Sequence, residues 1–277
     1  LIGYTYGSQF INTRTKTKLD SVTFKTDEHR GIQHTIAINA SPKLSYFTIT
    51  PFFNYTEKWY DKQIERSIDR NTNAPVTNDI KVIKAVRYYD LGVSAATKLY
   101  GIFQPGVLGI KGIRHQISPS LTYTYQPDFS RPRYGYYGTY RDTLGVEQKY
   151  NFYERESFGG APAGERQAVG LNIGNVFEMK MEGNDSSGQE KKFTLLNLNA
   201  GLSYNFAADS LKFSEIGLDY RTSIGEMLSI GGRSSFNLYK FEVDPNDPRR
   251  AGRVNKFLFK EQGRLAQLTS FGVSIGT

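Results

Sequence analysis

The chain has 277 residues, no cysteine, 38% hydrophobic and 14% aromatic residues, a mean hydropathy of −0.49 and a formal net charge of +8. A helical membrane protein is excluded, because no segment approaches the roughly 18 uninterrupted apolar residues of a membrane-spanning helix. Disulfides, thiolate metal sites and cysteine nucleophiles are excluded as well. The positive charge indicates an anionic partner, such as nucleic acid, an anionic membrane surface or an anionic lipid headgroup.

Tyrosine, phenylalanine and glycine are abundant, which favours sheet over helix. Alternation of apolar and polar residues, bounded by Gly, Pro, Asn, Asp and Ser, predicts about ten strands. We interpret residues 1–277 as one segment of a single all-β domain, either mature or excised, because the chain begins without methionine or a signal region. The predicted strands span residues 1–13, 31–41, 45–60, 82–101, 111–126, 166–182, 191–206, 212–222, 227–242 and 264–277.

The strand predicted at 111–126 shows the most regular alternation. It is longer than the roughly 5–6 residues usual in soluble proteins and suits a tilted strand that crosses a bilayer. Tyr123 and Tyr125 end its apolar side, where an interfacial aromatic girdle would lie. One side carries Ile113, His115, Ile117, Pro119, Leu121, Tyr123 and Tyr125, and the other carries Arg114, Gln116, Ser118, Ser120, Thr122 and Thr124.

Residues 45–60 and 193–206 repeat this two-sided pattern. The connections between the predicted strands form a second pattern. Short and long connections alternate along the chain, and 208–210 is the exception. Outer-membrane barrels have short periplasmic turns and long extracellular loops, so the pattern predicts an antiparallel transmembrane β-barrel. The short connections are 41–43, 104–106, 184–188 and 223–225, and the long ones are 14–30, 61–81, 127–165 and 243–262.

The long loop 127–165 interleaves many tyrosines with Arg131, Arg133 and Arg141. Aromatic residues next to arginines suit a platform for single-stranded nucleic acid. No recognisable nucleic-acid module accompanies them, so we favour an extracellular loop whose basic groups meet anionic sugars and phosphates.

Candidate catalytic and metal-binding groups are sparse. His29, His34 and His115 fall in different predicted elements without metal-ligand spacing. Glu215, Asp219 and Arg221 share one face of strand 212–222, where paired carboxylates suit a hydrolase but also the charged lumen wall of a barrel. We favour the lumen wall and expect no enzymatic activity, no metal and no cofactor.

The stretch from Arg114 to Pro127 resembles the Arg-His-x-x-x-Pro-x-x-x-Tyr-x-Tyr-x-Pro strand of the LptD family, the outer-membrane lipopolysaccharide-assembly barrels. The matching positions are Arg114, His115, Pro119, Tyr123, Tyr125 and Pro127. A second resemblance is the Asn-x-Φ-Glu-x-Lys end of the next strand, from Asn175 to Lys180. The chain is more similar to the divergent versions seen in Bacteroidetes or Chlorobi than to proteobacterial ones, and no periplasmic jellyroll segment is recognised.

The resemblance implies a very large barrel, of which ten strands are only part, that passes lipopolysaccharide from a periplasmic bridge to the outer leaflet. It also implies a plug lipoprotein in the lumen and contact with outer-membrane lipid, with no nucleic-acid partner. Two alternatives stay open: a porin-like or gated outer-membrane channel, and a soluble β-domain that binds glycan or nucleic acid. The residues expected to face the lumen are Arg114, Gln116, Asn197, Asn199, Glu215, Asp219 and Arg221.

Overall fold

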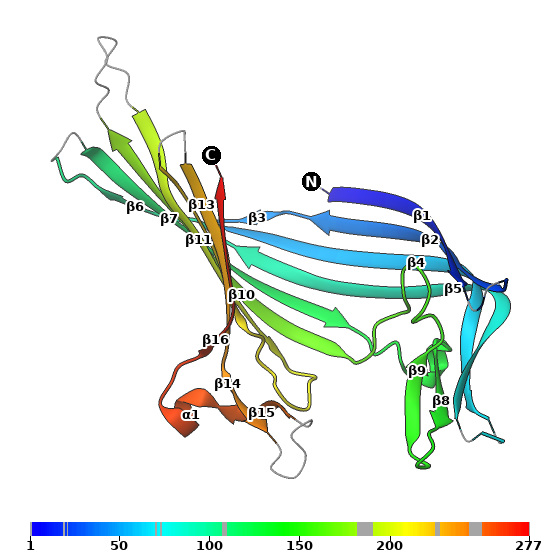
Figure 1. The fold of residues 1–277 in the computed structure, drawn as a ribbon. Helices are drawn as coiled ribbons and strands as arrows, with labels where there is room; N and C mark the ends of the chain where they lie inside the picture. The colour runs from blue at the N-terminus through cyan, green and yellow to red at the C-terminus, as the bar shows by residue number, and fades with distance from the viewer. Residues whose placement is uncertain are drawn as a thin grey trace. The chain divides into compact units, whose positions relative to one another are not determined.

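The structure, a computed structural model, describes residues 2–18, 20, 22–69, 71–72, 74–106, 110–181, 191–224, 228–243 and 251–276. About three quarters of them lie in antiparallel β-strands (Figure 1). The first strands are β1 (Ile2–Lys18), β2 (Phe24–Ala40), β3 (Lys43–Leu44), β4 (Phe47–Ile68), β5 (Pro75–Ala96), β6 (Leu99–Phe103) and β7 (Ile110–Gln126). The remaining elements are η1 (Pro132–Tyr134), β8 (Tyr137–Arg141), β9 (Glu147–Asn151), β10 (Arg166–Met181), β11 (Lys191–Asn205), β12 (Ile216–Ile224), β13 (Leu228–Asn237), β14 (Tyr239–Val243), β15 (Ala251–Phe257), α1 (Leu258–Gln262) and β16 (Gln267–Gly276).

One large sheet contains most of these strands, in the order β1-β2-β4-β5-β7-β10-β11-β12-β13-β16. Strand β3 pairs with β4, and β6 pairs with β7. Each strand along this path lies beside the next long strand of the sequence, which is the arrangement that hairpin connections produce. The order begins with β1 and ends with β16, so the sheet of the described residues is open.

Each of the ten predicted strands overlaps a strand along this path, although the strand predicted at 82–101 also runs across the break between β5 and β6. The fold class is confirmed as all-β and antiparallel. The predicted boundary at residue 212 is wrong, since β12 begins at Ile216, and the strand predicted at 227–242 is divided into β13 and β14. The predicted turn at 184–188 lies outside the described residues, and so does Gly225 of the turn at 223–225.

Two predicted loops are wrong in extent, because their residues continue the strands. Strands β1 and β2 pair without interruption from Ile2↔Ala40 to Lys18↔Phe24, which covers most of 14–30. Strand β4 reaches Ile68 and β5 begins at Pro75, which leaves little of 61–81 as a turn. Both faces of these strand extensions are largely polar, so the sequence shows no alternation of apolar and polar residues there. The backbone hydrogen bonds between the strands do not depend on that alternation. A further consequence is that His29 and His34 both lie on β2.

The structure divides into two compact units, and the first comprises Leu1–Ala40, Pro51–Gly92 and Tyr125–Arg166. In this unit the segment 127–165 contains η1 and the β8–β9 hairpin, and it packs against β4 and β5 (Figure 1). The rings of Tyr60 and Tyr153 stack with centroids 5.3 Å apart. The buried core of this unit consists of Tyr60, Val86, Phe129, Tyr153 and Ala161.

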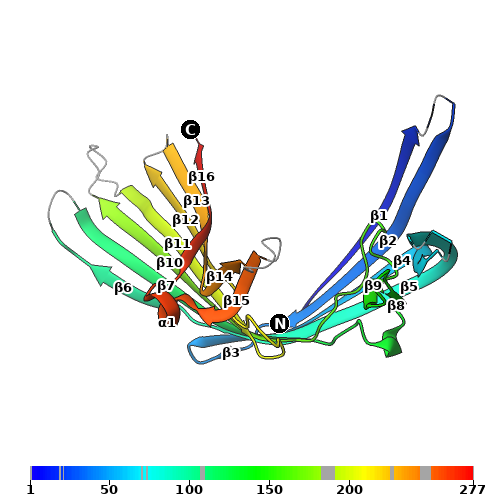
Figure 2. The same cartoon turned by 60° about the horizontal axis from the view of Figure 1, so that its bottom comes forward.

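The second unit comprises Ser41–Thr50, Val93–Thr124 and Gln167–Thr277. Strands β14 and β15 pair with each other, and α1 follows them, so that the connection between β13 and β16 has a structure of its own (Figure 2). Tyr239 stacks on Phe257 at 5.0 Å between ring centroids, and Phe257 meets Phe213 at 5.9 Å. These aromatic contacts hold the β14–β15 hairpin to the segment that precedes β12.

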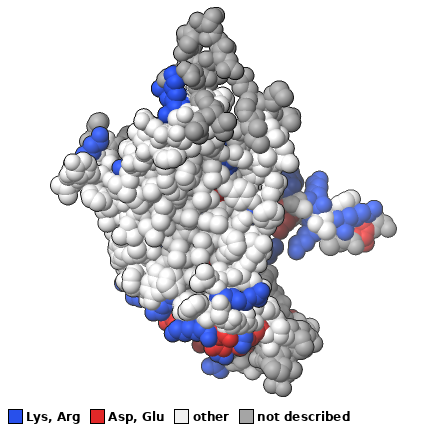
Figure 3. Space-filling model, turned by 90° about the vertical axis from the view of Figure 1, so that its left-hand side faces the viewer, with Lys and Arg blue, Asp and Glu red and all other residues white. Residues whose placement is uncertain are grey.

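Large apolar side chains remain exposed on the long strands. Tyr4 on β1 is 75% exposed, and Phe271 on β16 is 65% exposed. Figure 3 shows a face that is white across most of its middle, with lysine, arginine and acidic residues gathered toward its ends. This face is therefore poor in charge, and the exposed apolar side chains of the long strands suit an apolar environment around them. Among the described residues, no helix is long and apolar enough to cross a membrane.

Candidate functional site

The candidate site lies where β7 and β10 are neighbours in the sheet. Arg114 and His115 are consecutive residues of β7, so their side chains point to opposite faces. The partners of both come from the segment Asn175–Lys180 of β10. The two sequence motifs that resemble the LptD family are therefore joined side chain to side chain in the second unit.

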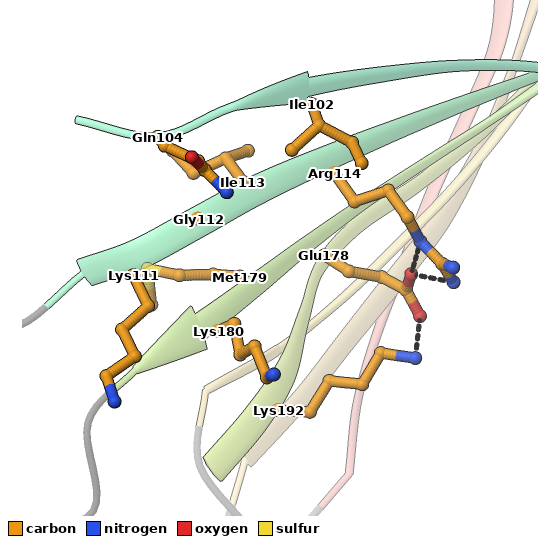
Figure 4. Close-up of a pocket in the computed structure, with 10 residues that line it drawn as sticks. All are labelled: Ile102, Gln104, Lys111, Gly112, Ile113, Arg114, Glu178, Met179, Lys180 and Lys192. Atoms are coloured by element: carbon orange, nitrogen blue, oxygen red, sulfur yellow. Dashed lines mark hydrogen bonds and ion pairs between the residues drawn. The ribbon is translucent and has the colours of Figure 1, made fainter. Parts of the chain in front are cut away.

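On one face, Glu178 lies between two cations (Figure 4). Arg114 donates from Nε to Glu178 Oε2 at 2.6 Å, and its terminal guanidinium nitrogen contacts the same oxygen. Lys192 on β11 approaches Glu178 Oε1 at 2.8 Å. The guanidinium of Arg114 also lies over the ring of Tyr100, 5.9 Å from its centroid. Both carboxylate oxygens are thus engaged, and three adjacent strands are linked through one side chain.

On the opposite face, His115 stacks on Phe177 with ring centroids 4.0 Å apart and planes inclined by 9°. Its Nε2 lies 3.0 Å from Asn175 Oδ1. The imidazole is thus held by one ring and one amide, an arrangement that fixes its orientation.

A β-bulge separates the two halves of the β10 motif. Phe177 pairs with Leu196 and Glu178 pairs with Thr194, so Leu195 has no opposite residue in the register. Bulges bend a strand and redirect the side chains beyond them. Here the extra residue, Leu195, belongs to β11 and lies opposite the junction between Phe177, which packs on His115, and Glu178, which binds Arg114.

Four of the polar residues predicted from the sequence lie in register across β11 and β12. Asn197 is opposite Arg221, and Asn199 is opposite Asp219. Asp219 is opposite Arg233 on β13, and Arg233 Nε donates to Asp219 Oδ1 at 2.5 Å. A shallow hollow of about 350 Å³ is lined by these four predicted residues and their neighbours. The predicted polar side of the sheet therefore extends over several adjacent strands.

The other predicted residues have separate surroundings. Gln116 donates to Ser118 Oγ at 3.1 Å, and Glu215 accepts from Asn237 Nδ2 at 3.0 Å just before β12 begins. Of the motif residues, Pro119 accepts a backbone bond from Thr97 through its carbonyl, Tyr123 is 39% exposed, Tyr125 is half-buried and Pro127 is buried.

The three arginines of segment 127–165 have different local partners. Arg131 pairs with Glu165 at 3.2 Å, and the Arg133 guanidinium lies 4.7 Å from the ring centroid of Tyr134. Arg141 is exposed at the end of β8, opposite Glu147.

A buried lysine in the first unit was not recognised from the sequence as a site residue. Lys58 on β4 is 4% exposed, and its Nζ donates to the carbonyl oxygens of Phe158, Gly159 and Gly160 at 2.6, 3.3 and 3.2 Å. The Tyr60 hydroxyl donates to Gly159 O at 2.7 Å. Strand β4 thereby holds the segment 127–165 through its backbone. In the sequence, Lys58 alternates with the apolar residues of its strand, as exposed lysines commonly do. This position does not reveal that Lys58 is buried.

The buried carboxyl group of Glu156 belongs to the same contact. Its side chain is 0% exposed, and its Oε1 lies 3.3 Å from His29 Nδ1, while Oε2 has no hydrogen-bond partner in the described structure. Burial raises the pKa of Glu156, against the opposing effects of Lys62 and His29. The packed segment therefore holds a proton on Glu156 at pH values where an exposed glutamate has lost it.

Replacing Glu156 with glutamine is expected to flatten the pH dependence of this contact. Because the raised pKa belongs to the packed state, wild-type stability declines as pH rises above 4.5, the ordinary value for glutamate, toward the packed-state pKa. Glutamine carries no charge, so the variant lacks this decline and is the more stable protein at neutral pH, by on the order of 1 kcal/mol. Thermal unfolding midpoints across this pH range measure the effect. Parallel pH profiles for variant and wild type would contradict it.

Comparison with known proteins identifies the family. A search of curated proteins finds no match. The family described as LptD protein matches residues 1–239, which is well over half of the chain and includes both motifs of the β7–β10 site. This match confirms the resemblance predicted from Arg114 to Pro127. The chain belongs to the LptD family of non-enzymatic lipopolysaccharide transport and assembly proteins of the outer membrane.

Proposed function

We propose that this chain forms part of the wall of a transmembrane β-barrel that carries lipopolysaccharide across the outer membrane and inserts it into the outer leaflet. The observation that carries the proposal is the two-sidedness of adjacent strands. Arg114, Glu178 and Lys192 form a charged cluster on one side, while His115 and Phe177 pack on the other. A sheet with one charged and one apolar side suits a wall between an aqueous lumen and lipid.

The apolar side is the one that meets the acyl chains of the membrane. The charge-poor face in Figure 3 and the exposed aromatic and aliphatic residues of β1 and β16 support this orientation. Strands of 15–22 residues are long enough to cross the hydrocarbon layer with a tilt and to project beyond it.

The polar side lines the lumen, along which the sugars of lipopolysaccharide travel. Hydroxyl, amide and charged groups replace the water bound to the sugars, while the acyl chains leave sideways into lipid. The lining residues on this proposal are Arg114, Gln116, Asn197, Asn199, Glu215, Asp219 and Arg221.

The open edges at β1 and β16 are closed in the complete protein. Unpaired backbone groups cost several kcal/mol each in hydrocarbon, so a sheet in a bilayer must form a closed barrel. We propose that further strands of the full protein complete the barrel, which opens laterally to release the lipid.

Three partners follow from this proposal. A periplasmic bridge delivers the lipid, a plug lipoprotein occupies the lumen, and outer-membrane lipid surrounds the apolar side. Arg131, Arg133 and Arg141 pair with phosphates of the outer leaflet through charge-assisted hydrogen bonds. The long-loop end of the strands accordingly faces the cell exterior.

Depletion of the full-length protein in its own cells tests the proposal. We expect lipopolysaccharide to disappear from the cell surface and to accumulate inside the cell envelope, as measured by surface labelling and fractionation. Unchanged surface lipopolysaccharide after depletion would contradict the transport role. Planar-bilayer currents separate this function from a porin, since a steady open conductance that is insensitive to a plug partner is the property of a passive channel.

A further inference from the structure

We propose that a hollow on the outer face of β1, β2, β4 and β5 binds a sugar ring of the lipopolysaccharide that surrounds the protein in the outer leaflet. The outer face is the one that carries Tyr4 of β1, and the proposed function, on which this inference rests, turns it away from the lumen. The hollow belongs entirely to the first unit, and the strands that form it are neighbours (Figure 1). The site is therefore separate from the conduit.

Two adjacent rows of side chains form the hollow, which has a volume of about 210 Å³. The first row is apolar and crosses β1, β2 and β4 in register. The second row lies two positions further along the strands and contains an ion pair and an isoleucine of β5. Residues two positions apart on a strand share a face, so both rows belong to the outer face. The first row is Phe10, Ile32 and Trp59, and the second row is Arg30, Asp61 and Ile83.

Charged residues of the same face border the hollow on both sides along the strands. On one side Arg87 Nη2 donates to Glu57 Oε1 at 3.1 Å, and on the other side Arg14 lies opposite Glu28. Charged side chains on the lipid-facing side of a barrel are destabilising within the hydrocarbon layer. The hollow therefore lies beyond that layer, at the level of headgroups and sugars. An exposed apolar patch with a polar rim is also typical of a binding surface.

The Arg30–Asp61 pair decides the chemistry of the ligand. Arg30 Nε donates to Asp61 Oδ2 at 2.6 Å, which uses one of five N–H donors and one of two carboxylate oxygens. An acyl chain over this pair would take it out of water without replacing its hydrogen bonds. A phosphate would meet the carboxylate of Asp61 as well as the guanidinium. Hydroxyl groups both donate and accept, so sugar hydroxyls can donate to Asp61 and accept from Arg30.

Trp59 supplies an aromatic surface with a fixed orientation. Its Nε1 donates to Glu57 Oε1 at 2.7 Å, and its ring meets His34 with centroids 4.7 Å apart and planes inclined by 61°. Trp59 is still 46% exposed, and Phe10 of the same row is exposed as well. The C–H bonds on one side of a sugar ring carry a slight positive charge, which the negative face of an aromatic ring attracts. The first row therefore suits the apolar side of a sugar, while the second row suits its hydroxyls.

The size of the hollow suits a single sugar ring. Its volume of about 210 Å³ corresponds to about seven water molecules at about 30 Å³ each. A sugar ring with its hydroxyls fits this space, whereas a longer glycan must continue outside it. Small-molecule sites commonly combine an apolar lining with a few polar groups that fix the orientation of the ligand, as here.

The test measures binding of the glycan that mild acid releases from the cells' own lipopolysaccharide. The purified full-length protein is titrated in a detergent without sugar, and saturation-transfer NMR detects the glycan protons that contact it. We expect transfer to the ring C–H protons of the glycan. Two competitors define the chemistry. Mannitol is an open-chain polyol without a flat C–H side, and phosphatidylethanolamine has acyl chains but no sugar, so neither should displace the glycan at equal concentration.

Variants locate the binding in the hollow. Phe10→Leu/Trp59→Leu keeps apolar side chains but removes both rings, and we expect it to bind the glycan about tenfold or more weakly. Asp61→Asn removes the charged acceptor and should weaken binding about fivefold. Its ion pair is exposed, so this variant carries the test if the double variant does not fold. The matched control is Phe24→Leu, which removes an exposed ring of β2 outside the hollow and should leave binding unchanged.

Equal glycan binding by the wild type and by both hollow variants would overturn the inference, because the glycan then binds elsewhere, for example in the lumen. Displacement of the glycan by phosphatidylethanolamine at equal concentration would overturn it as well, since the hollow then holds acyl chains. Failure of the proposed function has a different signature. It appears as normal surface lipopolysaccharide after depletion of the protein, whatever the binding measurements show.

Discussion

Substitution of Lys58 by methionine is expected to release the segment 127–165 from strand β4. The Lys58 ammonium is buried and donates to three consecutive backbone carbonyls, so its loss leaves these oxygens without their charged donor. Hydrogen bonds to charged groups contribute about 1.5–3 kcal/mol each, and the three share one ammonium, so we expect a loss of about 3 kcal/mol. Protease cleavage within 127–165 of the folded, membrane-inserted protein measures the opening, and its rate should rise roughly 100-fold.

Two matched variants calibrate this result. Tyr60→Phe removes one hydroxyl donor to Gly159 and should cost about 1 kcal/mol. Lys84→Met replaces an exposed lysine on the neighbouring strand β5 and should leave the cleavage rate unchanged. Equal cleavage rates for Lys58→Met and Lys84→Met would show that the aromatic core alone holds the segment.

Reversal of one charge in the β7–β10 site is expected to impair assembly of the sheet, and exchange of both charges to restore it. In Arg114→Glu, the new carboxylate faces Glu178 instead of the guanidinium that normally binds it. Repulsion at this distance, reduced by the partial exposure of both side chains, costs about 2 kcal/mol, or roughly a 30-fold change in population. The double variant Arg114→Glu/Glu178→Arg recreates an attractive pair across the same two strands.

The amount of heat-modifiable folded protein in outer membranes provides the measurement. We expect Arg114→Glu to reduce it strongly and the double variant to return most of it. Asp219 and Arg233 form the comparison pair on β12 and β13, where the side chains are 47% and 77% exposed. Reversal of Arg233 should have a smaller effect, because water screens that pair more fully. A double variant no better than Arg114→Glu would indicate that the two residues act independently.

The positions of the main strands along the chain were predictable, because the alternation that marks a strand is a local signal. A pleated strand turns successive side chains to opposite faces, so a strand between lipid and water must alternate along its length. Strand β7 shows this most clearly, and its predicted span, 111–126, differs from Ile110–Gln126 by one residue. Where both faces are polar, as in Arg14 to Lys18 of β1, the alternation disappears although the ladder continues. The predicted strands are too short at those ends for this reason.

The candidate site was predictable only in part. Arg114 and His115 were recognised as neighbours with opposite orientations, which follows from the sequence alone. Their partners depend on how β10 aligns with β7, and the bulge after Phe177 changes the register of β10 against β11. Alternation cannot reveal such a bulge, since one extra residue on a strand changes the phase without changing the composition. The contacts of Glu178 with Arg114 and with Lys192 are therefore a result of register.

By itself the sequence determined an all-β fold, the main strands and the division of β7 into a polar and an apolar side, because these properties depend on residues close together in the chain. Only the tertiary structure decided that Lys58 is buried under segment 127–165, that Glu156 lies beside His29, and that Arg114 binds Glu178. These contacts join residues that are 64 to 127 positions apart. Their energy comes from burial and hydrogen bonding between distant segments, which no local pattern of side chains records.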